Sequence, residues 1–383
     1  MVRSAPLPLW QHIRSLGVNA SKNERWFPYN LRYDHWISIA STCALLLSSS
    51  LSAQVAAGRA SFDTAYVRDY SRKLTMRLYS NTKYNALTIA SGSATDLVYR
   101  PNNRINIGIG ASYRALTLNI GFGVPFLNND DAVRGKTRYL DAQANIHTRR
   151  WASNMFLQVF SGYYVASHDL SQVGWVQETE RPYRADLVQF NIGASALHIF
   201  NHRKFSYRAS FNQDAWQRKS QGSFLLGGYL TYYDLRADSS LVPMVLSEQF
   251  DPGVRVRRGN FTDVGPMGGY AFTYVLKEHW FVTLSGAVGA GLSIQRLLLV
   301  SDDGEHLRPL TGPGWHAQLR AALGYNSRRT YVGLLFNQEN VGYLTAGEQG
   351  IRWNVGNVRV NLVHRFNQRI KQADRGIRWL NGL

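Results

Sequence analysis

The 383-residue sequence has one cysteine and no apolar stretch of the roughly 18 or more residues that indicate a transmembrane helix. The missing stretch excludes a typical helical membrane protein. The single cysteine, Cys43, lies within an N-terminal apolar run, so the chain beyond it has no thiol for a disulfide or a thiolate metal site. We therefore expect neither a cofactor nor a bound metal.

Acidic residues are also scarce, with 25 Asp and Glu against 43 Lys and Arg, which leaves a formal net charge of +18. Such a charge favours anionic partners. We exclude nucleic acid, because the basic residues are scattered and no nucleic-acid-binding module surrounds them. The expected partners are outer-membrane lipid and lipopolysaccharide, and a periplasmic or surface protein is a further candidate.

The N-terminal apolar run, residues 36–51, precedes the small-residue sequence of residues 52–54. A short apolar core followed by small residues is the arrangement of a secretory signal peptide. We expect cleavage after Ala53, with Ala57 as the alternative site. The prediction is an exported protein whose leader, residues 1–53, is removed.

The strongest structural signal is the alternation of side chains in two neighbouring segments, 104–112 and 115–123. In the first, Ile105, Ile107 and Ile109 share one face, while small and polar residues occupy the other. Alternation over about nine residues matches a membrane-crossing β-strand, apolar toward lipid and small or polar toward a lumen. A soluble sandwich would carry Lys or Glu on its polar face, so the pattern predicts a transmembrane β-barrel.

The same pattern recurs along the chain, in segments 139–147, 187–200, 205–212, 269–276, 280–292, 315–326, 330–337 and 351–366. The last of these changes phase at Gly356 and Asn357, which predicts a β-bulge. Since even numbers prevail in single-chain barrels, we expect an all-β, antiparallel, up-and-down barrel of about 12 strands, or 14 as the next count.

The expected organisation is a leader over 1–53, a short periplasmic segment over 54–72, the barrel over 73–366 and a tail over 367–383. Short turns near 113–114, 147–150 and 200–203 are expected in the periplasm. The same alternation places the long segment 234–266 there as well, although periplasmic connections are usually short. Either that segment is an exception, or a strand near it has been missed.

Several short motifs carry a resemblance to a known family. They comprise YRPN at 99–102, GIGASY at 108–113, LNIGFG at 118–123, KTRYLDAQ at 136–143, FLQ at 156–158, GYY at 162–164, FSYR at 205–208 and GSFL at 222–225. Over roughly residues 62–366 the chain resembles uncharacterised outer-membrane barrels of Bacteroidota type, known only as a domain of unknown function. The resemblance implies an outer-membrane location and a barrel fold, and it implies no catalytic residues.

Alternation places a set of polar side chains in the predicted lumen: Asp141, Gln143, Asn145, Arg208, Gln318, Arg320, Arg359 and Arg365. We expect the arginines to pair with carboxylates such as Asp141 and amides such as Asn145, so that they close the lumen with a polar plug. The alternative is a basic constriction that favours anions.

The candidates for catalysis are few. His198 and His364 lie at strand ends on the predicted lipid face, where a lipid-modifying enzyme would place a base. No serine hydrolase signature accompanies either, so we interpret both as interface residues. His147 and His316 are expected to be hydrogen-bonded in the lumen.

Two charged runs, 255–258 and 302–305, are interpreted as exposed loops rather than phosphate or calcium sites. The prediction is a non-enzymatic outer-membrane barrel with a structural, assembly or small-solute channel role. A lipid-modifying barrel enzyme is the alternative.

Overall fold

The computed structural model describes residues 62–92, 95–103, 105–113, 116–123, 130–167, 171, 180–301, 303–346 and 349–367. All of them belong to one compact unit that begins at Ala57. The predicted signal peptide and the tail beyond residue 367 lie outside the described residues. Among the described helices, none is both long and apolar enough to cross a membrane.

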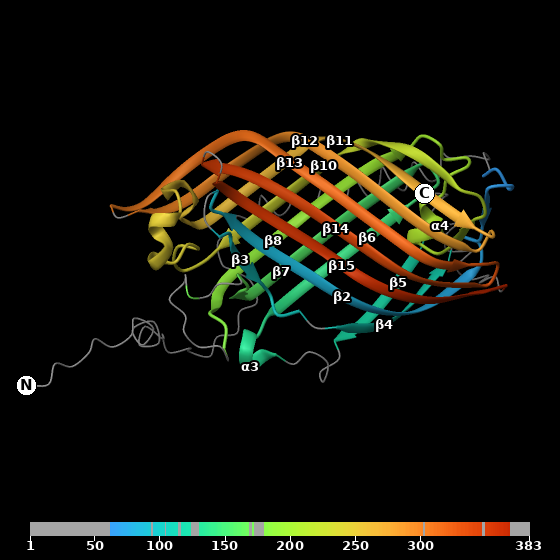
Figure 1. Ribbon diagram of the computed structural model, residues 1–383, viewed down its shortest axis with the longest axis horizontal. Coiled ribbons are helices and arrows are strands. Elements are labelled where there is room, and N and C mark those ends of the chain that lie inside the picture. Colours follow the sequence, from blue (N-terminus) through green and yellow to red (C-terminus); the bar gives the residue numbers. More distant parts are fainter. Residues whose placement is uncertain are drawn as a thin grey trace, which may run out of the picture. The chain divides into compact units, whose positions relative to one another are not determined.

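Thirteen strands form one antiparallel sheet, and ten of them close into a ring because β15 (Gln349–Phe366) pairs with β2 (Leu74–Ala90). From β15 the ring runs through β14 (Thr330–Ala346), β13 (Gly304–Asn326), β12 (Trp280–Ser301), β11 (Val256–Leu276), β10 (Gln221–Arg236), β8 (Tyr183–Ile199), β7 (Trp151–Val165) and β3 (Leu97–Arg100) to β2 (Figure 1). The predicted antiparallel β-barrel is confirmed.

Three strands of the sheet lie outside the ring of ten. β4 (Asn106–Tyr113) pairs with β2, β5 (Leu116–Gly123) pairs with β4, and β6 (Arg138–His147) pairs with β7. The short helix α3 (Asp131–Arg134) lies between β5 and β6 in the sequence. The predicted count of about 12 strands falls between the ten of the ring and the thirteen of the sheet.

The two faces of the wall differ in the way that a bilayer requires. On β12, Leu284 and Val288 point outward and are 58% and 70% exposed, whereas the intervening Ser285 is buried inside. The closed ring pairs the backbone of its strands internally, as a strand in hydrocarbon must be paired. An apolar outer face around a polar interior identifies a transmembrane β-barrel of the outer-membrane type.

The segment 205–212 is not the predicted strand. Residues Tyr207–Phe211 form the short helix α4, whose first turn is capped by the Ser206 side chain accepting a hydrogen bond from the Ala209 amide. The strand β9 (Ala215–Gln217) follows and pairs with β1 (Val67–Asp69). Five residues are too few to distinguish a helical from a strand periodicity, and here packing inside the barrel decided the outcome.

This helix also resolves the position of the long segment. Because 205–212 is not a strand, β8 and β10 are direct neighbours, and the chain between β10 and β11 reaches the opposite end of the barrel. The prediction that 234–266 lies with the short turns is therefore wrong. Only 237–255 is a connection, and it contains the 3-10 helices η2 (Met244–Gln249) and η3 (Pro252–Val254).

The predicted bulge at Gly356 and Asn357 is also wrong. β15 keeps one continuous register with β2 from Gly350 to Phe366. Trp353 and Val355 simply point into the lumen, where an apolar cluster surrounds them. The change of phase in the sequence thus marks a change from an apolar to a polar lumen along one regular strand.

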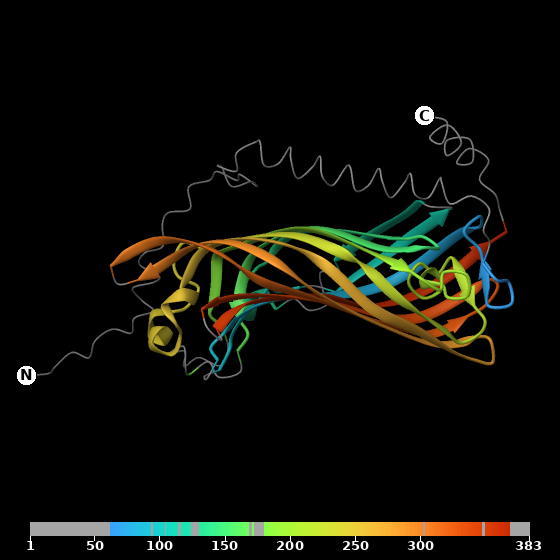
Figure 2. The ribbon, with the colours of Figure 1, turned by 90° about the horizontal axis from the view of Figure 1, so that it is seen from above.

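Different segments pack into the two ends of the barrel. We call the end with the connections 148–150, 277–279 and 327–329 the turn end, and the opposite end, with 237–255, the loop end. Figure 2 shows α4 at one end and the helical loop at the other. At the loop end, buried side chains of 237–255 pack onto aromatic residues of the strands; this cluster includes Leu241, Leu246, Phe250, Tyr233, Phe261, Tyr343 and Trp353.

Candidate functional site

The turn end of the lumen is filled by residues 205–217, which we call the plug. Tyr207 is bonded through its hydroxyl to Ser285 Oγ at 2.7 Å, and Ser210 Oγ lies 2.6 Å from Thr283 Oγ1. The Tyr331 hydroxyl donates to the Ser210 carbonyl at 2.9 Å. Since these partners project inward from β12 and β14, the plug is fixed to the inner wall by side chains that alternate along regular strands.

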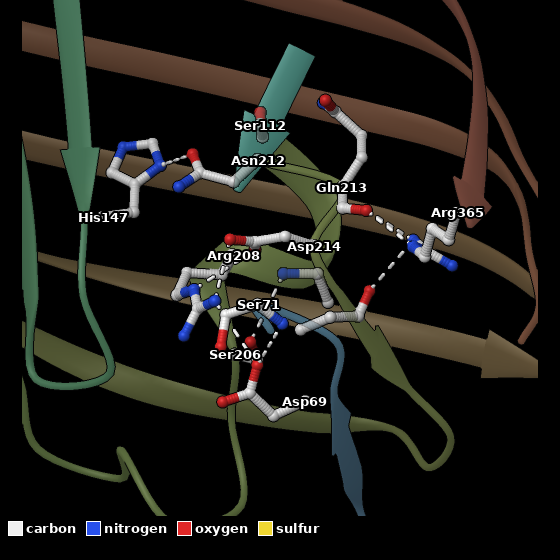
Figure 3. Close-up of polar contacts among 12 residues, drawn as sticks. Asp69, Ser71, Ser112, His147, Ser206, Arg208, Asn212, Gln213, Asp214 and Arg365 are labelled. Atoms are coloured by element: carbon white, nitrogen blue, oxygen red, sulfur yellow. Dashed lines mark hydrogen bonds and ion pairs between the residues drawn. The ribbon is translucent and has the colours of Figure 1, made fainter. Parts of the chain in front are cut away.

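Arg365 holds the end of the plug by its backbone. Its side chain donates to the Gln213 carbonyl, from Nε at 2.8 Å and from Nη2 at 2.6 Å, and the residue is 1% exposed (Figure 3). Gln213 has a φ of 61°, a left-handed conformation that costs energy in a non-glycine residue. The predicted lumen residue Arg365 therefore binds backbone carbonyls rather than a carboxylate.

Arg208 lies in the plug rather than on a strand, which corrects its predicted position. Its guanidinium pairs with Asp214 at 2.7 Å and with Asp69 at 3.4 Å. Asp69 belongs to β1, so this pair joins the plug to the first described strand (Figure 3). A buried arginine with two carboxylates is satisfied and has no free charge for a solute.

Above the plug, a polar network crosses the lumen. His147 contacts Asn212 Oδ1 through Nδ1 at 2.8 Å, and its Nε2 lies 3.2 Å from Arg320 Nη1. Arg320 Nη2 lies 3.9 Å from Glu339 Oε1, and His316 Nε2 lies 3.6 Å from Glu339 Oε2. The network links the plug to β13 and β14, and both predicted lumen histidines are part of it.

Asp141 has a different partner from the one predicted. Its carboxylate pairs with Lys83 at 2.7 Å and accepts from Gln158 at 3.0 Å. Arg359 instead lies over the Tyr79 ring, 4.8 Å from its centroid. The expectation that lumen arginines pair directly with Asp141 is wrong, because lysine on the long strand β2 reaches it.

Sequence reasoning missed Lys83 and Glu339. The segment expected at 330–337 ended two positions before Glu339, and the strand containing Lys83 has a weak pattern. Extending the alternation of β14 by one more pair of residues would have placed Glu339 on the inner face. Its contact with Arg320 follows from the register of the β13–β14 hairpin, in which Glu339 lies opposite Gln318 and Asn337 lies opposite Arg320.

The remaining predicted lumen residues surround a small space. Gln318 donates to Ser195 Oγ at 2.8 Å. Gln143 and Asn145 line a cavity of about 30 Å³ together with Arg320 and Glu339. Within the described residues, no group of His, Cys, Asp and Glu is placed to hold a metal ion.

The outward histidines lie among aromatic rings at the turn end. The His198 ring lies 5.2 Å from Trp151 and 5.1 Å from Phe200, and His364 lies 4.6 Å from Phe366. Such rings are typical of the aromatic girdle at a membrane interface. At the loop end, Arg257 pairs with Glu305. Arg257 lies in β11 and Glu305 in β13, so these parts of the two charged runs are strand ends and not the predicted loops.

Comparisons with known proteins give a family match and several distant solved structures. No curated protein matches the sequence. Similar solved structures include the outer membrane protease OmpT from Escherichia coli, with 10% identity, a TM-score of 0.34 and coverage of 81% of this chain and 99% of that one. The translocator domain of the autotransporter NalP from Neisseria meningitidis has 9% identity, a TM-score of 0.30 and coverage of 86% and 98%.

A bacterial polysaccharide outer membrane secretin has 8% identity, a TM-score of 0.31 and coverage of 78% of this chain and 100% of that chain. These values are too low to transfer a function from any of the three proteins. The sequence profile of a family described as a domain of unknown function (DUF4421) matches residues 61–366, which span the whole described barrel. The chain therefore belongs to this family of uncharacterised outer-membrane barrels.

Proposed function

We propose that this protein is a non-conducting outer-membrane barrel with a structural or assembly role. The observation that carries the proposal is the state of the lumen. The plug lies in the turn end, and the loop 237–255 with its aromatic cluster packs into the loop end. A hydrated solute needs a continuous polar path, and both closures lie across that path.

The character of the two closures supports a permanent seal. The plug is held by buried hydrogen bonds to three strands: Tyr207 bonds Ser285 of β12, and Tyr331 of β14 and Arg365 of β15 bond backbone carbonyls of the plug. The loop end is sealed by apolar burial, and the Tyr99 hydroxyl adds a 2.5 Å hydrogen bond to the Leu241 carbonyl. Opening a pore would expose apolar area and leave several buried polar groups unpaired.

The proposed orientation follows the general rule that short turns face the periplasm. This rule puts the plug, β1 and the ends of β2 and β15 on the periplasmic side, and the loop 237–255 outside the cell. The expected signal peptide would direct export. The outward histidines support no enzymatic role, since His198 and His364 pack against aromatic rings of an interface.

The experiment is conductance in planar bilayers. We expect no channel activity from the wild-type protein or from a variant in which residues 207–216 are replaced by a short Gly-Ser linker, because the loop end still closes the lumen. A second variant that also shortens 238–254 should conduct, which shows that the assay detects an open barrel. Defined single-channel steps from folded wild-type protein would overturn the proposal.

A further inference from the structure

Three arginines at the turn end differ from the arginines that pair with acids. At the loop end many are paired with acids: Arg184 with Asp186 at 2.7 Å, Arg236 with Asp234 at 2.5 Å, Arg352 with Asp96 at 2.6 Å, and Arg257 with Glu305. At the turn end, Arg218 pairs with Glu278 at 2.9 Å and Arg208 with Asp214, whereas Arg149, Arg150 and Arg203 form no ion pair within the described part of the chain. Three neighbouring arginines with no ion pair favour an anion from outside the chain.

The backbone brings these three arginines together. Thr148 Oγ1 accepts hydrogen bonds from the amides of Arg150 and Trp151 at 3.2 and 2.9 Å, which shapes the turn between β6 and β7. The Ile199 amide donates to the Arg150 carbonyl at 2.7 Å, so the turn is tied to the end of β8. Arg203 follows that end by four residues.

Arg149 is the central member of this cluster. Both of its terminal nitrogens are shielded from solvent, and neither has a hydrogen-bond partner. Its pKa is lowered, first by desolvation and then by the charges of Arg150 and Arg203. A shielded guanidinium with unused donors is costly unless an acceptor binds to it.

The cluster lies beside the aromatic girdle. His202 stands 6.1 Å from His198, ring to ring, and His198 contacts both Trp151 and Phe200. Burial and the charges of Arg149 and Arg150 lower the pKa of His202, so the imidazole adds no charge near neutral pH. Aromatic girdles mark the level of the lipid headgroups, so the arginines lie where lipid phosphates are found.

We propose that Arg149, Arg150 and Arg203 form a binding site for the phosphate of a membrane-lipid headgroup. Guanidinium groups bind phosphate oxygens through paired, charge-assisted hydrogen bonds. The girdle beside the cluster supplies a surface for the acyl chains of the same lipid. The proposal depends on the membrane location of the turn end and is independent of whether the lumen conducts.

The test is native mass spectrometry of the folded protein in detergent, titrated with phosphatidylglycerol, with diacylglycerol and with inorganic phosphate. The variant replaces Arg149, Arg150 and Arg203 with glutamine. The matched control replaces three exposed arginines of the loop end, Arg100, Arg258 and Arg308, with glutamine, which removes the same charge.

We expect wild type and control to retain phosphatidylglycerol with equal affinity, and the triple variant to bind it at least about tenfold more weakly, or about 1.4 kcal/mol. Diacylglycerol should not be retained. The single variant Arg150→Gln, at an exposed position, should show a smaller loss and covers the case in which the triple variant does not fold.

Three results would overturn the proposal. One is equal phosphatidylglycerol binding by wild type and both turn-end variants. Another is equal loss in the loop-end control, which would indicate a general effect of charge. The third is displacement of the lipid by inorganic phosphate at similar concentration, which would make the cluster a site for free anions.

Discussion

At the scale of single residues, the charged side chains of the lumen depend on specific partners. Arg365 binds the carbonyl of Gln213, more than 150 positions away, whereas Glu339 lies near Arg320 and His316 of the neighbouring strand β13. Buried charges of this kind contribute little net stability while paired, yet removing one partner is costly because the other is left uncompensated. The network therefore favours one arrangement of plug and wall over others.

The cost of removing one partner of a buried ion pair can be measured at Arg320. Arg320→Met should lower the free energy of unfolding by about 3–5 kcal/mol, since Glu339 loses its cation inside the lumen. Adding Glu339→Gln should recover part of the loss, because the remaining buried charge is removed. Urea unfolding in detergent, followed by the shift between folded and unfolded bands on a gel, gives both values. Additive losses in the double variant would mean that the two side chains do not interact.

At the scale of elements, β5 and β6 differ from the other long strands of the wall. β5 pairs only with β4 and β6 only with β7, so each has one edge without a partner strand among the described residues. β12, in contrast, pairs with β11 and β13 along nearly its whole length. Strands paired on one side open more easily than strands paired on both.

Hydrogen exchange should reveal this difference. We expect amides of β6 to exchange at least about tenfold faster than amides of β12 at the same membrane depth, because local opening of β6 breaks one ladder instead of two. Amide exchange of the barrel in bilayer discs, read by mass spectrometry of peptides, measures the ratio. Similar protection of both strands would show that β5 and β6 pair with each other in the membrane.

At the scale of the whole molecule, the apolar outer face determines where the protein is stable. Outward residues of β12 such as Leu284 are strongly exposed, although they lie in the middle of a long strand. In water this surface would aggregate, and in a bilayer it is covered by acyl chains. The apolar outer face therefore determines both that the protein lies in a membrane and that it is stable there.

Leu284→Arg tests the position of this belt. We expect a loss of about 2–4 kcal/mol, because the substitution places a charge near the middle of the hydrocarbon layer. The control is Leu307→Arg, since Leu307 is 70% exposed near the loop-end tip of β13 and should cost at most about 1 kcal/mol. Unfolding titrations in lipid vesicles compare the two, and equal losses would contradict the proposed depth of β12.

Much of the fold follows from local pattern, because the two faces of a membrane strand meet opposite solvents. Alternation over 315–326 and 280–292 agrees with strands β13 and β12, and it puts Gln318 and Arg320 on the inner face. The same local rule misassigned 205–212 and the phase of Trp353. In both places apolar side chains face the interior of the barrel. Alternation alone cannot distinguish them from apolar side chains that face lipid.

The sequence by itself determined that this chain is an antiparallel transmembrane β-barrel with polar residues directed inward, because that information lies in the spacing of neighbouring residues. Only the tertiary structure decided that residues 205–217 pack inside the barrel. The plug depends on contacts between Ser210 and Thr283 and between Gln213 and Arg365, more than 70 and 150 positions apart. Such partners are chosen by the closure of the ring, which brings distant strands to face one another, and no local spacing records that choice.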